Sequence, residues 1–193
     1  MAILVLGLIL FLGVHSVRIF ANDWRSRAIA ARGEKFYKGL YTVVSLAGFA
    51  LIVWGYGLAR HNPVAIWNPP RGMNHLAALL MLFSFVLLVA AYVPRNAIKA
   101  KLHHPMILGV KVWALAHLLV NGMLADVVLF GAFLVWAVLD FRAARKRDRE
   151  GNVQYAAGTA RGTAIAVVVG LVGYAVFALW LHGLVIGVRP FGV

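Results

Sequence analysis

The sequence predicts an all-α membrane protein, a bundle of about six transmembrane helices. Hydrophobic residues make up 63% of the 193 residues and charged residues 13%, whereas soluble domains are roughly half apolar and a quarter charged. Apolar runs close to the ~20 residues that cross a hydrocarbon core recur along the chain. These runs are residues 2–20, 39–58, 75–93, 105–120, 123–141 and 163–188.

The first run is interpreted as a transmembrane helix, and a loop with several prolines separates the second run from the third. No Lys or Arg precedes run 2–20 and no small-x-small cleavage site follows Arg18, so we interpret this run as a helix and not as a signal peptide. The loop 59–74 contains Asn62-Pro63 and Pro69-Pro70, which prevent a continuous helix. Trp67 in this loop is placed as an interfacial anchor.

The fourth and fifth runs are predicted to form a tight hairpin. Run 105–120 has 16 residues, which rise only about 24 Å at ~1.5 Å each. Asn121-Gly122 is then a two-residue turn. The polar segment 142–161 reads as a solvated extension of the fifth helix. Because no repeat or long linker is found, we expect one domain over residues 1–193.

The net charge of +13 would suggest nucleic acid in a soluble protein, but its distribution favours a lipid bilayer instead. Groups of five, three and six basic residues occupy alternate connections, and the remaining segments hold Arg60, Arg71 and Arg189. The positive-inside rule therefore predicts both termini on the periplasmic side. The basic groups are Arg25, Arg27, Arg32, Lys35 and Lys38; Arg95, Lys99 and Lys101; and Arg142, Arg145, Lys146, Arg147, Arg149 and Arg161.

Histidines and a lysine in an apolar segment are the strongest functional signal, because polar groups at membrane depth are costly. Helical spacing from residue 103 would place His103, Met106 and His117 on one face, with His104 and Lys111 on a neighbouring one. The sequence contains no cysteine, so metal ligands must come from His, Met or carboxylates.

His15 on the first helix offers a partner from a second helix. Histidines on two helices of a bundle can hold a haem iron, and they can also simply bond between helices. Lys111 has two readings, snorkelling toward the membrane surface or pairing with an anion such as a haem propionate. Arg18 is an equally good partner for a propionate.

Motifs along nearly the whole chain resemble the NnrU family. They are His15-Ser16, Gly33-Glu34 with Tyr37, Val44-Ser45-Leu46, His104-Pro105, Ala116-His117 and Asn121-Gly122. With His61 and His75, the same framework is similar to plant and cyanobacterial ζ-carotene isomerase, which uses a b-type haem. The resemblance implies a bacterial inner-membrane protein in which His15 and His117 are axial ligands of haem b, between the first and fourth predicted helices.

The resemblance leaves both the ligand pair and the activity open. His15 lies near the basic side, whereas His117 is thirteen residues beyond His104, about 20 Å at helical rise. His103 or His104 is therefore the alternative partner of His15. The implied activity is redox isomerisation of a lipophilic small molecule. Because NnrU proteins are named for an association with nitrite and nitric oxide reductase expression, a non-enzymatic factor in expression or maturation of those enzymes is the alternative.

A weaker resemblance concerns membrane methyltransferases of the isoprenylcysteine type. His104-Pro105 followed by Gly109 is similar to their Arg-His-Pro motif, with His103 in place of the Arg. The later paired glutamates of that family are missing here and only Glu150 remains. Methyl transfer is therefore the least favoured of the three functions, and the sequence specifies neither a substrate nor an oligomeric state.

Overall fold

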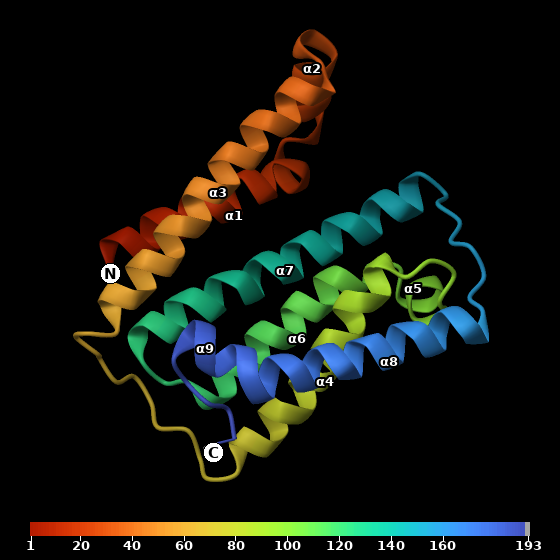
Figure 1. The fold of residues 1–193 in the computed structure, drawn as a ribbon. Helices are drawn as coiled ribbons and strands as arrows, with labels where there is room; N and C mark the ends of the chain where they lie inside the picture. The colour runs from red at the N-terminus through yellow and green to blue at the C-terminus, as the bar shows by residue number, and fades with distance from the viewer. Residues whose placement is uncertain (192–193) are drawn as a thin grey trace. The chain divides into compact units, whose positions relative to one another are not determined.

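All six apolar runs are helical in the computed structural model, which describes residues 1–191 and contains no strand within them. Figure 1 shows the helices in chain order from red to blue. They are α1 (Ala2–Phe20), α3 (Glu34–Ala59), α4 (Met73–Tyr92), α6 (Pro105–Val120), α7 (Leu124–Glu150) and α8 (Ala160–Val176), which continues through η1 (Phe177–Leu181) and α9 (His182–Ile186).

Two further helices were not predicted. The basic segment after α1 forms α2 (Asn22–Arg32), and the segment after α4 forms α5 (Ala97–Leu102). Asn96 caps α5 by accepting a 2.7 Å hydrogen bond from Lys99 N–H, as expected of an Asn at this position. Both helices are charged, and apolar periodicity therefore gave no sign of them.

The protein is a multi-pass membrane protein. Five helices are long and apolar enough to cross a bilayer, and α6, at 16 residues, is shorter, as its run predicted. Large apolar side chains cover the outside of the helices. Phe20 is 72% exposed and Leu184 is 81% exposed, a degree of apolar exposure that suits contact with lipid.

The contacts divide the chain into two compact units, which are described separately. Unit 1 comprises Met1–Asn68 and Asn121–Ala143. In it α1 packs along α3. The first part of α7 joins them through the rings of Phe11 and Phe133, whose centroids are 5.8 Å apart. The Tyr56 hydroxyl on α3 also donates a 2.5 Å hydrogen bond to Asp126 on α7. These side-chain contacts link α7 to α1 and to α3.

Unit 2 comprises Pro69–Val120 and the described residues from Ala144 onward. In it α4 packs against both α6 and α8. The fully buried Ser84 on α4 donates a 2.8 Å hydrogen bond to the Gly109 carbonyl of α6. Interhelical hydrogen bonds of this kind help to hold helices together in membranes, where lipid removes the hydrophobic driving force.

Candidate functional site

His15 lies near the end of α1 and its ring is held by a hydrogen bond within the helix. Its Nδ1 is 2.6 Å from the backbone oxygen of Phe11, one turn earlier. A carbonyl oxygen can only accept a hydrogen bond, so Nδ1 carries a proton and donates it to this oxygen. Histidines that ligate a metal usually donate their other ring nitrogen in this way. The local geometry of His15 therefore fits a metal ligand.

Three aromatic rings from three helices surround the His15 ring. Phe11 of α1 stacks on it at a centroid distance of 4.2 Å. Tyr41 of α3 lies at 5.1 Å, and Trp136 of α7 lies edge-on at 6.0 Å. These contacts give the ring an aromatic environment, which suits a flat apolar ligand.

The buried Nε1 of Trp136 has no hydrogen-bond partner within residues 1–191. Buried donors are nearly always satisfied in folded proteins, so this N–H marks a place suited to an acceptor oxygen of a ligand or a water. Ser45 lies one turn after Tyr41 on α3, and its hydroxyl interacts with the Tyr41 hydroxyl.

His117 lies near the end of α6, in unit 2, and repeats the arrangement of His15. Its Nδ1 is 2.9 Å from the backbone oxygen of Trp113, again four residues earlier. The Trp113 ring is 5.3 Å from the His117 ring. By the same reasoning the His117 Nδ1 carries a proton. The two sequence-predicted axial ligands thus share an Nδ1–H bond to the carbonyl one turn earlier.

The two predicted cationic partners occupy different helices. Arg18 lies in the last turn of α1, nearly one turn beyond His15, and it is exposed. Lys111 lies in the middle of α6, between His104 and His117 in sequence, and it is partly buried. Arg18 is thus placed on the same helix as one predicted ligand, and Lys111 on the same helix as the other.

His103 does not share a helix face with His117, so the predicted alignment of these two residues was wrong. Helix α6 begins at Pro105. His104 lies just before the helix, and its carbonyl accepts the first helical hydrogen bond, from Leu108 N–H at 3.2 Å. The His104 N–H bonds the Leu102 carbonyl at 2.8 Å, and His103 between them has φ 67°. This is a strained γ-turn, which breaks the helical periodicity at His103.

The strained turn presents both histidines to one carboxylate. The His104 Nε2 is 2.8 Å from Asp148 Oδ2, and the His103 Nδ1 is 3.4 Å from the same oxygen. Tyr155 stacks on the His103 ring at 4.1 Å and donates to Asp148 at 3.1 Å. Arg145 bonds His103 as well. His103 and His104 are therefore part of one polar cluster with Asp148, Tyr155 and Arg145.

Sequence reasoning missed most of this cluster. Asp148 lies in the segment interpreted as a solvated extension, yet its side chain is only 12% exposed. Burial, followed by the hydrogen bond to Asp148, raises the pKa of the Tyr155 hydroxyl. Tyr155 therefore stays a neutral donor. The sequence gives no sign that Asp148 has polar partners. His104 is 44 residues away from it in the chain, and Tyr155 lies beyond the turn that follows α7.

Replacing Asp148 with Asn is expected to destabilise unit 2. The change removes the charge that accepts bonds from His104 and Tyr155, and charged hydrogen bonds are worth about 1.5–3 kcal/mol each. We expect a loss of roughly 1–3 kcal/mol in thermal unfolding of the detergent-solubilised protein. Glu150→Gln is the matched control, because Glu150 is 62% exposed and pairs with Lys146 at 3.6 Å. Equal effects of the two changes would show that the cluster adds no stability.

The NnrU family model matches residues 3–190. The chain belongs to the NnrU family. No curated protein and no solved structure matches it. The family match covers His15, Ser45, His117 and Trp136, and it confirms the resemblance found in the sequence.

Within the described part of the chain, no three His, Asp or Glu side chains of this NnrU protein gather in a way that could hold a metal ion.

Proposed function

We propose that this NnrU protein binds one b-type haem, with His15 and His117 as its axial ligands. The observation that carries the proposal is the pair of Nδ1–H bonds to the carbonyls of Phe11 and Trp113, each four residues earlier on the same helix. Each bond orients its ring and places a proton on Nδ1, which is the usual arrangement of histidines that ligate a metal through Nε2.

Other residues of the chain would hold the porphyrin in place. The apolar rings of Phe11 and Tyr41 offer a dry surface next to His15. The buried Trp136 N–H would donate to an acceptor oxygen of the ligand. Arg18 and Lys111 are the candidate cations for the propionates, because a charged hydrogen bond to a carboxylate is a strong one.

When bound, the haem would supply redox chemistry for isomerisation of a lipophilic small molecule. The protein would hold the His15 ring through its hydrogen bond to the Phe11 carbonyl. The rings of Phe11, Tyr41 and Trp136 would exclude water from the bound group. Isomerisation is suggested by the similarity to ζ-carotene isomerase, and family membership alone does not determine activity.

The experiment that tests this function is haem quantification on protein purified from membranes, together with oxidised and reduced absorption spectra. We expect one haem b per chain. A folded, haem-free protein that still supports nitrite or nitric oxide reductase expression would contradict the proposal and favour a non-enzymatic factor. Conversion of a cis polyene by the reduced protein alone would support the isomerase activity.

A further inference from the structure

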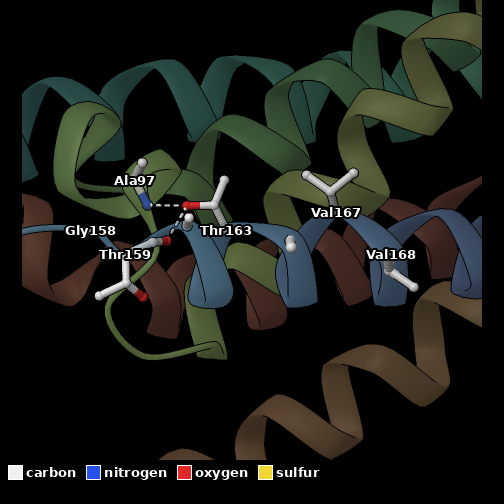
Figure 2. A pocket seen from close by; sticks show the side chains of 8 residues that line it. Ala97, Gly158, Thr159, Thr163, Val167 and Val168 are labelled. Atoms are coloured by element: carbon white, nitrogen blue, oxygen red, sulfur yellow. Dashed lines mark hydrogen bonds between the residues drawn. The ribbon is translucent and has the colours of Figure 1, made fainter.

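An open groove runs beside the start of α8 in unit 2. Its volume is about 580 Å³, within the range of roughly 300–1,000 Å³ that is typical of ligand sites. Figure 2 shows the labelled side chains from α5, the loop before α8 and α8 itself around it. The lining residues are Ala97, Gly158, Thr159, Ala160, Thr163, Ala164, Val167 and Val168.

Hydrogen bonds keep the floor of the groove in place. Thr159 N–H donates to the Arg95 carbonyl at 2.7 Å, and Ala97 N–H donates to Thr163 Oγ1 at 2.9 Å. The second bond is drawn in Figure 2. A Cβ on Gly158 would lie 2.8 Å from the Asn96 carbonyl carbon, so only glycine allows this approach. The groove is thus part of the folded structure of unit 2.

The groove changes from polar to apolar along α8. Thr159 and Thr163 lie at the start of the helix, and Val167 and Val168 lie one to two turns further on. The helical stretch Ala160–Ile186 is long and apolar enough to cross a membrane. The polar end therefore lies at a membrane surface, and the apolar end lies among lipid chains.

The segments that form the groove are basic and carry no carboxylate. Residues 93–102 and 151–176 include no Asp or Glu. Lys99 donates to the Ala91 carbonyl at 2.8 Å, whereas Arg95, Lys101 and Arg161 are exposed. Lys101 follows the lining residue Ala97 by one turn of α5, and Arg161 precedes the lining residue Ala164 by three residues on α8. This charge favours an anionic occupant.

We propose that the groove binds an anionic phospholipid. One acyl chain lies along Ala164, Val167 and Val168, and the phosphate is bound by Arg161 and Lys101. The apolar part of the groove suits an acyl chain, and the basic residues near its polar end suit a negatively charged headgroup. This site is independent of the proposed haem ligands, because neither His15 nor His117 lines it.

The test is lipid binding by the full-length protein in vesicles that contain equal amounts of dioleoylphosphatidylglycerol and dioleoylphosphatidylcholine. Native mass spectrometry of the released protein counts each lipid per chain. Ala164→Trp fills the groove and is expected to lower bound phosphatidylglycerol about tenfold. Val172→Trp is the matched control, because Val172 lies further along α8, is 57% exposed and does not line the groove.

A second pair of variants tests the headgroup contacts. Replacing Arg161 and Lys101 with Gln is expected to reduce the preference for phosphatidylglycerol about tenfold. Replacing the exposed Arg27 and Lys35 with Gln, which removes the same charge from unit 1, should leave that preference unchanged. Equal losses from both pairs would overturn the proposal, as would equal lipid binding by the two tryptophan variants. A dimer that Ala164→Trp dissociates would also overturn it, by assigning the groove to a second copy of the chain.

Discussion

Replacement of Gly55 by Val is expected to unfold unit 1. Gly55 on α3 faces the backbone of α1, and a Cβ there would lie 2.7 Å from the Ile3 carbonyl carbon and from Leu4 Cα. Both atoms belong to the main chain, which cannot move aside without separating the helices. Overpacking typically costs about 1–3 kcal/mol and sometimes more, and we expect at least about 3 kcal/mol at this contact.

The same helix provides a control for the Gly55 variant. A Cβ on Gly57 would meet no atom within 4 Å beyond its chain neighbours and its own helix backbone, so Gly57→Val adds the same side chain without a clash. Thermal unfolding in detergent, followed by circular dichroism, should show a large loss for Gly55→Val and little change for Gly57→Val. Similar melting temperatures would contradict the close packing of α1 on α3.

Alanine at His15 or at His117 is expected to remove most of the bound haem. Each change deletes one iron ligand and leaves the Phe11 or Trp113 carbonyl on a helix backbone that is otherwise unaltered. Loss of a metal ligand generally lowers affinity far more than loss of an outer partner, which costs about 10–100-fold. We expect the Soret absorbance per chain to fall more than about tenfold in each variant.

Three comparisons make the histidine experiment specific. His182→Ala should retain the Soret band, because the His182 ring bonds the Val188 carbonyl, outside its own helix, at 2.6 Å in an exposed contact. Added imidazole should partly restore the band in His15→Ala by occupying the space of the missing ring. If His103→Ala or His104→Ala removes the haem while His117→Ala keeps it, the assignment of His117 is wrong.

The apolar helices could be read from the sequence because lipid imposes a simple rule on length and composition. Two of them, α1 and α6, have the predicted bounds; at α6 this is because Pro105 suits the first position of a helix. The helix α7 continues past Phe141 to Glu150, so the first part of segment 142–161 is the helical extension that was predicted, and the rest of the segment up to α8 is not helical. Charged residues with good helix propensity can continue a helix beyond the membrane.

The site was predictable only in part. His15 and His117 stood out as polar residues in apolar runs, but their Nδ1–H bonds depend on side-chain rotation toward a carbonyl one turn away. The γ-turn at His103 could not be foreseen, because positive φ is rare for a residue with a side chain. Trp136 and Tyr41 lie beside His15 only through tertiary contacts of α7 and α3 with α1, which no local pattern encodes.

The central claim, that His15 and His117 both ligate one haem iron, is tested most directly by near-infrared magnetic circular dichroism of the purified ferric protein. This spectrum reports the identity of both axial ligands. We predict the signature of two imidazole ligands in the unaltered protein and its loss in His15→Ala and in His117→Ala. A haem with a single histidine ligand, or a folded protein that binds no haem after growth with excess haem, would contradict the claim.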